Sequence, residues 1–191
     1  MKNFIIILLN IFMVLSLTAC GDNGSENLDA LQSVVMDYYN RTYDCYIDLK
    51  YEDMSDVLYL ESIPAYNMDT ELKKMITRAE CSIEAGFGHE TEKAKYAYDF
   101  GETVYNNDGT ATVTVDVERM DKPDENTVNI ISDPYFIFLG NNVFTLIQDN
   151  NKWKITSHTA DTMNWWDEYS ADEKIEFNKE QEIAKFYSEF E

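Results

Sequence analysis

The residues best suited to acid–base chemistry are the histidines, because imidazole titrates nearest to neutral pH. Asp161 follows His158 by three positions, and a histidine beside a carboxylate is the arrangement of a general base and its orienting group. The alternation that begins at Trp153 and Ile155 nevertheless places His158 on the face of its strand that points away from the core. His89 falls in an expected loop. We therefore predict no catalytic residue and keep His158 with Asp161 as the weaker alternative.

A second set of residues is suited to binding. Tyr38, Tyr98 and Trp153 fall on an expected long helix and on two expected strands, where they would either line a small-molecule pocket or fill the core. Trp165 and Trp166 stand in an acidic segment outside the main pattern. They would either stack on a sugar or a partner protein, or close one end of the domain.

Motifs for cofactors, metals and covalent catalysis are missing. The chain has no GxSxG elbow, Walker loop, HExxH or CxxC motif, and Asn106 to Gly109 lacks the further ligands of a calcium loop. We predict no cofactor and no metal site. Cys45 and Cys81 are available for a disulfide outside the cytoplasm, although Cys45 on the apolar side of its helix equally suits a buried free thiol.

The first residues indicate export and lipidation. Lys2 precedes an apolar run from Phe4 to Leu17 of about 14 residues, which has the length of a signal-peptide core and is shorter than the roughly 20 residues of a membrane span. Leucine, threonine, alanine and cysteine then follow at positions 17–20. This ending resembles the lipobox of bacterial lipoproteins.

The lipobox resemblance implies where the protein is found. Residues 1–19 would be removed as a signal peptide, and Cys20 would carry a diacylglycerol anchor with palmitate-type acyl chains. Residues 20–27 would form a short flexible tether. We expect the folded part on the extracytoplasmic side of the cell membrane, or on the outer membrane in a cell that has one.

The charge of the chain restricts its partners. Lysine and arginine number 15 against 36 aspartates and glutamates, which gives a formal net charge of −21. Such a chain is repelled by phosphate backbones, so we exclude nucleic acid as a partner. It attracts cations and cationic peptides, although a solvated acidic surface also serves simply to keep a domain soluble.

Helical spacing dominates the first half of the chain. A long helix is expected from Leu28, with Asn27 as its N-cap, and a short one from Ser55 that ends before Pro64. A third is expected to begin near Asp69 or Thr70 and to stop at Gly86. These three helices would precede a sheet.

Alternating apolar residues follow, which predicts an antiparallel sheet of four or more strands and an α+β fold. Turns are expected at Asn106 to Gly109 and at Asp149 to Asn151. The expected strands are Tyr96 to Phe100, Thr110 to Glu118, Tyr135 to Leu139, Val143 to Ile147 and Trp153 to Ser157.

A terminal acidic helix completes the expected domain plan. Ser170 and Glu173 form a capping box for it, with Ile175, Ile183, Phe186 and Phe190 on its apolar side. We expect this helix to pack on the sheet rather than to reach another chain. The domain is placed at residues 28–163 and the helical extension at 164–191.

The order of these elements, closing on FTLIQDNNKWKITSH, resembles the cone-shaped fold of the nuclear-transport-factor-2-like, or cystatin-like, superfamily. The tyrosine-rich first helix and the WKITSHTAD ending are similar to modules that precede amidase-like domains in secreted bacterial proteins. No amidase domain is expected here. Enzymes of the superfamily work inside the cone, but a fold does not transfer a function by itself.

Three functions follow as hypotheses. The first is a non-enzymatic, membrane-anchored module that binds a protein, a cationic peptide or a cell-envelope component. The second is a small-molecule-binding protein, or an enzyme of the isomerase or dehydratase type, in the cone pocket. The third is an immunity-type lipoprotein that sequesters a basic toxin.

Overall fold

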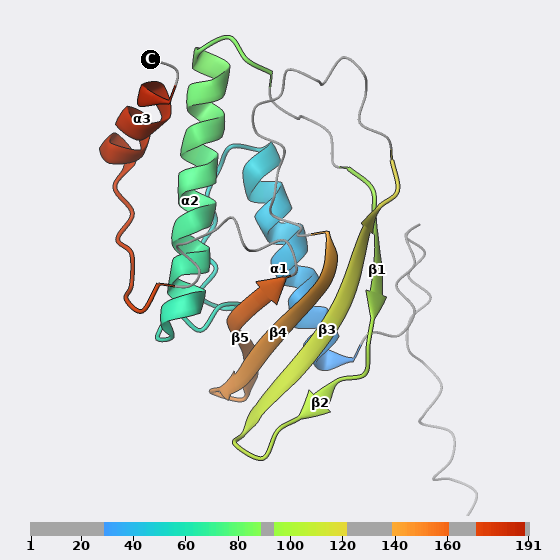
Figure 1. The fold of residues 1–191 in the computed structure, drawn as a ribbon. Coiled ribbons are helices and arrows are strands. Elements are labelled where there is room, and N and C mark those ends of the chain that lie inside the picture. The colour runs from blue at the N-terminus through green and yellow to red at the C-terminus, as the bar shows by residue number, and fades with distance from the viewer. Residues whose placement is uncertain (1–28, 89–93, 122–138, 161–170, 190–191) are drawn as a thin grey trace, which may run out of the picture.

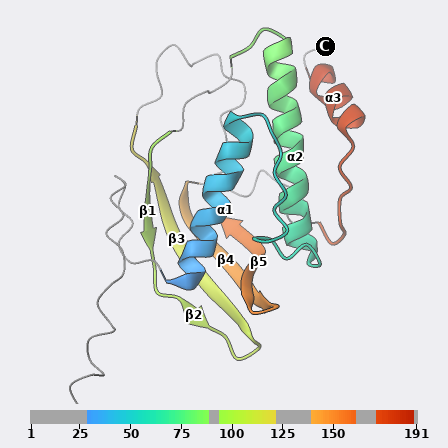
Figure 2. The same cartoon turned by 180° about the vertical axis from the view of Figure 1, so that it is seen from behind.

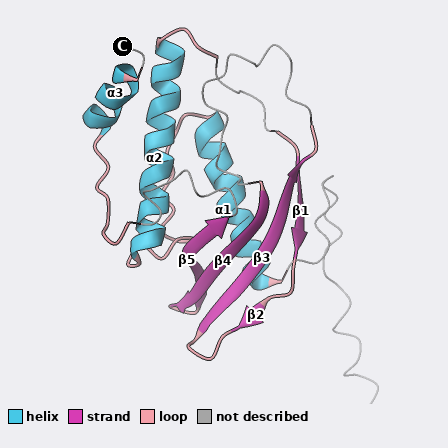
Figure 3. Cartoon of the chain, in the orientation of Figure 1, coloured by secondary structure: helices cyan, strands magenta, loops and turns pink. Residues whose placement is uncertain are grey.

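The computed structural model describes residues 29–88, 94–121, 139–160 and 171–189, and these residues form an α+β fold (Figure 1). The prediction of that class is confirmed. Two helices precede five strands, and a third helix follows them (Figure 3). The elements are α1 (Ala30–Ile47), α2 (Ile63–Glu84), β1 (Tyr96–Phe100), β2 (Val104–Tyr105), β3 (Thr110–Arg119), β4 (Gly140–Asp149), β5 (Lys152–Ala160) and α3 (Lys179–Ser188).

The five strands form one open, antiparallel sheet. Its order is β1-β3-β4-β5, and the short strand β2 also pairs with β3. Helix α1 covers one face of the sheet, and α2 and α3 lie beyond β5, on the side away from β1 (Figures 1 and 2). None of the three described helices covers the opposite face, which we call the helix-free face.

The core lies between α1 and the sheet. Strand β3 alternates as its sequence predicted, because its alanine and valine side chains are buried and its threonine and acidic side chains face the other way. Tyr39 and Tyr46 of α1 meet Phe144 and Leu146 of β4 in this core, each at most 1% exposed.

The described helices include none that is long and apolar enough to cross a membrane.

The N-cap of α1 is Asp29 and not Asn27. Its side chain accepts hydrogen bonds from the backbone N–H groups of Leu31 (2.9 Å) and Gln32 (2.8 Å). The Gln32 side chain accepts one in return from the Asp29 N–H group (3.1 Å). This reciprocal pair requires glutamine or glutamate three residues after the cap. Asp29 meets that condition, and the prediction overlooked it.

The prediction of a short helix from Ser55 to Pro64 is wrong, so two helices and not three precede the sheet. Pro64 lies in the first turn of α2, and Ser62 is the N-cap. Proline suits this position because its missing N–H group would have no partner there and its fixed φ is already helical. The proline therefore marks the start of α2, well before the expected start at Asp69.

Residues 57–59, which precede α2, form a single parallel bridge with the edge of β5. The N–H group of Tyr59 donates to the carbonyl of Ile155 (2.8 Å), and the N–H group of Ile155 donates to the carbonyl of Val57 (2.8 Å). An uncovered sheet edge invites pairing with other chains. The chain itself therefore pairs with this edge of the sheet at Ile155.

Most of the predicted strands are confirmed. The predicted turn between β4 and β5 is confirmed too, with φ angles of 49° at Asn150 and 61° at Asn151. Strand β2 was not expected because two residues are too short for a periodic pattern. The expected strand from Tyr135 falls outside the described residues except for Leu139, which precedes β4.

Helix α3 begins at Lys179 with Asn178 as its N-cap, so the expected start at Ser170 is wrong. Side chains of α2 form hydrogen bonds with the segment that precedes α3. Asn67 accepts from the Ile175 N–H group (2.9 Å), and the Thr70 hydroxyl donates to the Ile175 carbonyl (3.0 Å). These bonds occupy the backbone groups that a helix would need at this position.

Helix α3 packs on α2 and not on the sheet, as Figures 1 and 2 show. Phe186 is 2% exposed at this contact, and Arg78 of α2 donates to Glu182 (3.0 Å) and to Glu189 (2.5 Å). The expected apolar side of the helix is thus correct at Phe186, while the surface that it meets is a helix.

Candidate binding site

The expectation that His158 points away from the core is wrong. His158 is 3% exposed. In the pairing of β4 with β5, Thr145 lies opposite Ser157 and Leu146 lies opposite Ile155, so Thr156 is an extra residue. This bulge shifts the alternation by one position and turns His158 to the same face as Ile155.

His158 has the environment of a neutral core residue. Its ring stacks on the ring of Phe144 with centroids 4.1 Å apart, and its Nε2 lies 2.8 Å from Oδ1 of the buried Asn142. The Nδ2 of Asn142 donates to the Gly140 carbonyl (2.7 Å), which leaves its Oδ1 as the acceptor and places the histidine proton on Nε2. Burial lowers the pKa of His158 to about 3.

Two of the three proposed pocket residues belong to one aromatic cluster. The Tyr38 ring contacts Phe144 and is 4% exposed, and Tyr39 lies between Tyr38 (5.9 Å between centroids) and Tyr98 (5.4 Å). Trp153 lies elsewhere, with its ring 6.1 Å from that of Tyr105. The structure therefore brings Tyr38 and Tyr98 into one aromatic cluster, while Trp153 packs against the same core at another place, beside Tyr105.

Tyr39 also belongs to this cluster, although it is not among the pocket residues predicted from the sequence. Its side chain is fully buried, and its hydroxyl has no hydrogen-bond partner among the described residues. Burial raises the pKa of Tyr39 well above the ordinary value for tyrosine, so the hydroxyl stays protonated. A buried hydroxyl without a partner is destabilising.

Cys45 and Cys81 are buried free thiols. Sγ of Cys45 accepts a hydrogen bond from the Glu52 N–H group (3.3 Å), and burial raises the pKa of both thiols above the ordinary value. Protonated thiols are poor nucleophiles, so neither residue has the surroundings of a reactive cysteine.

Several expected site residues lie outside the described ranges. They are Cys20, His89, Asp161, Trp165 and Trp166. Within the described ranges, no three side chains among histidine, cysteine, aspartate and glutamate are grouped to hold a metal ion.

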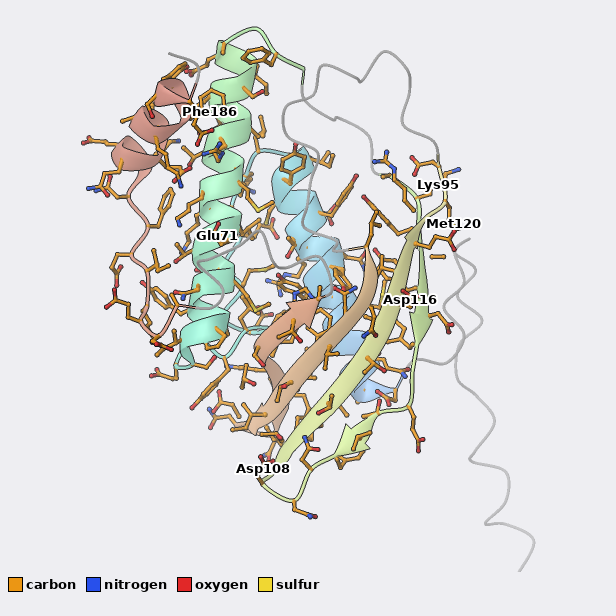
Figure 4. All side chains as sticks on the ribbon, in the orientation of Figure 1. Glu71, Lys95, Asp108, Asp116, Met120 and Phe186 are labelled. Carbon is orange, nitrogen blue, oxygen red and sulfur yellow. The ribbon has the colours of Figure 1, made fainter. Side chains whose placement is uncertain are left out.

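The helix-free face carries an arrangement of acidic residues that the sequence alone does not predict. Asp99 on β1 lies directly opposite Asp116 on β3, and both side chains are exposed. Ala97 and Glu118 form the next pair on this face. Figure 4 shows Asp116 on β3 beside β1. Like charges directly opposite each other across two strands are destabilising.

No cation compensates this pair within the described residues. On β4, Asn141 lies opposite Asp116, and on the other side the next pair is Gly101 and Thr114. Lys95 is four residues from Asp99, which is about 14 Å along an extended strand. The described ion pairs include neither Asp99 nor Asp116.

Two buried acidic residues on α2, unlike the aspartate pair, are paired with lysines. Asp69 accepts from Lys73 (2.6 Å), and Glu71 accepts from Lys74 (2.7 Å). Figure 4 shows Glu71 on α2, well away from Asp116. These two buried carboxylates are thus neutralised inside the molecule, while the aspartate pair faces solvent.

Strand β1 is held at both ends by α1. The Tyr43 hydroxyl accepts from the Ala94 N–H group (2.7 Å), and the Gln32 amide donates to the Gly101 carbonyl (3.2 Å). Between these ends the strand pairs with β3 on one side only, because β1 is the last strand of the sheet. The aspartate pair therefore lies next to a sheet edge whose position is fixed.

Alternation alone predicts that Asp99 and Asp116 face outward, but it does not place them opposite each other. That requires the register between β1 and β3, which are separated by the irregular segment around β2.

Comparison with protein-family models, with curated proteins and with solved structures found no match to this chain.

Proposed function

We propose that this chain is a membrane-anchored, extracytoplasmic lipoprotein that acts as a non-enzymatic binding module for a basic protein or peptide. The observation that carries the proposal is the exposed aspartate pair Asp99 and Asp116, with Glu118 beside it. A lysine or arginine from a partner would relieve the repulsion between these carboxylates. Binding would thus recover free energy that the isolated fold loses.

The charge of the whole chain supports the same class of partner. At a net charge of −21, the field of the protein attracts basic partners and speeds their encounter. The buried state of His158 and of the cysteine thiols also supports binding over acid–base or thiol chemistry at these residues.

The anchor and the fold family belong to this proposal too. The lipobox-like ending at Cys20 supports attachment to the membrane through lipid. A long N-terminal helix packed on an antiparallel sheet supports the cone-type, cystatin-like assignment. On this proposal the anchored domain would present the helix-free face to partners outside the cell membrane.

The test is a titration of the purified protein with a basic peptide at low and at high salt. Replacing both Asp99 and Asp116 by asparagine should weaken binding by about tenfold, since each exposed ion pair contributes up to about 1 kcal/mol. Replacing Asp172 by asparagine and Glu180 by glutamine removes the same charge from the α3 region and should leave affinity within about twofold. Equal losses in both variants would contradict a localised site.

A further inference from the structure

We infer that the edge of β1 accepts an extended, basic peptide segment as an additional strand of the sheet. The inference rests on the proposed function and deepens it, because it gives the partner a backbone conformation and a position. Four observations carry it: the direction of the backbone groups in β1, the state of the opposite edge, the surrounding charge and the side chains on the two faces.

Backbone hydrogen bonds between β1 and β3 fix which groups point outward. The Met120 N–H group donates to the Lys95 carbonyl (2.7 Å), and the Gly101 N–H group donates to the Thr114 carbonyl (3.0 Å). In an antiparallel pair, residues two apart repeat this pattern, so Ala97 and Asp99 also direct their backbone groups toward β3. Tyr98 and Phe100 therefore direct their N–H and C=O groups out of the sheet.

These outward groups form hydrogen bonds with none of the described residues. We call the N–H and C=O groups of Tyr98 and Phe100 the β1 edge. The β5 edge, by contrast, is covered by residues 57–59 through bonds to Ile155. The fold thus pairs part of the β5 edge with its own chain and leaves the β1 edge able to pair with an added strand, which is the binding mode called β-augmentation.

Charge selects the occupant of the β1 edge. A second copy of this chain is disfavoured, because edge-to-edge pairing would bring two chains of net charge −21 together with Asp99 near their junction. Charged side chains on edge strands commonly prevent self-association in this way. A basic segment meets the opposite condition, since its charges would lie beside Asp99 and Asp116.

The two faces of the added strand would meet different surfaces. On the helix-free face its side chains would lie beside Asp99 and Ala97, which are exposed. On the other face they would lie beside Tyr98 and Phe100, which are partly buried against the core. Successive side chains of a strand point to opposite faces. The segment that fits best therefore alternates between basic and apolar residues.

Hydrogen exchange of the backbone amides tests this inference directly. The probe is an octapeptide of alternating lysine and valine with blocked ends. On saturation, exchange of the Tyr98 and Phe100 amides should slow by at least about tenfold, because those N–H groups gain acceptors. The Ala97 and Asp99 amides already point toward β3 and serve as internal controls that should change by less than about twofold.

N-methylated probes provide a second test that does not alter the protein. One probe carries a methyl group on every valine amide nitrogen and the other on every lysine amide nitrogen. An added strand uses N–H groups from alternate residues only, so one probe should lose at least about tenfold in affinity while the other stays within about threefold. The probe that loses affinity also identifies whether the added strand runs parallel or antiparallel to β1.

The outcomes separate this inference from the proposed function. Salt-sensitive binding with equal loss for both methylated probes and no protection at Tyr98 or Phe100 would overturn strand addition alone. Absence of any binding of the unmodified octapeptide at low salt would overturn both. Protection confined to Tyr98 and Phe100, together with unequal loss for the two probes, is the result that the inference predicts.

Discussion

Asp99 on β1 and Asp116 on β3 occupy directly opposite positions on the helix-free face of the sheet. Both carboxylates are exposed, and the neighbouring positions on the same face of the described sheet are alanine, glycine, threonine, asparagine, valine and glutamate. Like charges at opposite positions of neighbouring strands are destabilising, so we expect this pair to cost stability in the isolated protein. This cost is the physical basis for expecting a cationic partner at this place.

The first prediction concerns stability without any partner. Asp116→Asn should raise the free energy of unfolding by roughly 0.2 to 1 kcal/mol, because it removes one of two like charges at opposite positions of neighbouring strands. The measurement is chemical denaturation at low salt. Asp172→Asn is the matched control and should leave the unfolding midpoint unchanged. A loss of stability in Asp116→Asn would mean that this carboxylate is compensated in a way that the described residues do not reveal.

The second prediction concerns pH. The pKa of His158 is lowered by burial to about 3 in the folded state and lies near 6.5 in the unfolded chain. Below about pH 6.5 the unfolded state binds the additional proton, so stability falls as pH decreases toward the folded pKa. By pH 5 the loss should reach about 2 kcal/mol.

Denaturation between pH 7.5 and pH 5 measures this effect. His158→Gln should flatten the pH dependence in that window, while His89→Gln should retain it. An unchanged slope in His158→Gln would contradict the assignment of His158 as a neutral core residue.

The third prediction concerns the hydroxyl of Tyr39, which is buried without a hydrogen-bond partner among the described residues. Tyr39→Phe removes an unsatisfied polar group and keeps the ring, so stability should be unchanged or rise by about 1 kcal/mol. Thermal unfolding of the two proteins gives the comparison. A loss of more than about 1 kcal/mol would show that the hydroxyl bonds a water molecule or another group, and would revive the pocket hypothesis for this cluster.

The fourth prediction concerns the lipid anchor. In a bacterial host the full chain should fractionate with membranes and incorporate labelled palmitate, because two or more acyl chains anchor a protein stably. Cys20→Ser should abolish the labelling, whereas Cys45→Ser should retain it because that thiol is buried in α1. Labelling that persists in Cys20→Ser would contradict the proposed anchor.

The strands were predictable where periodicity was long and regular. Ten residues of β3 alternate without interruption, and its threonine and acidic side chains face outward as the sequence indicated. The bulge at Thr156 was not predictable, because one extra residue reverses the faces of everything after it while leaving no local signal. The predicted orientation of His158 was wrong for this reason alone.

The predicted helix boundaries were wrong where one local sequence signal is compatible with two different structures. Pro64 was interpreted as the end of a helix, but proline is equally favoured in a first helical turn. The capping box at Ser170 and Glu173 did not start α3, because Asn67 and Thr70 of α2 bind the backbone of Ile175. Such contacts are distant in sequence, and a local pattern contains no information about them.

The sequence could not predict the aspartate pair, for a related reason. Each residue alone looked like an ordinary solvent-facing side chain of a half-buried strand. Their opposition depends on the register of β1 against β3, and the chain between these two strands passes through the short strand β2.

The measurement that tests the central claim most directly is a map of backbone amide chemical shifts during titration with the alternating lysine and valine octapeptide at low salt. A basic ligand at the proposed site should shift amides around Asp99 and Asp116 on β1 and β3, and the shifts should disappear at high salt. The amides of α2 and α3 should remain unchanged. Shifts confined to α2 and α3, or no shifts at all, would contradict the account.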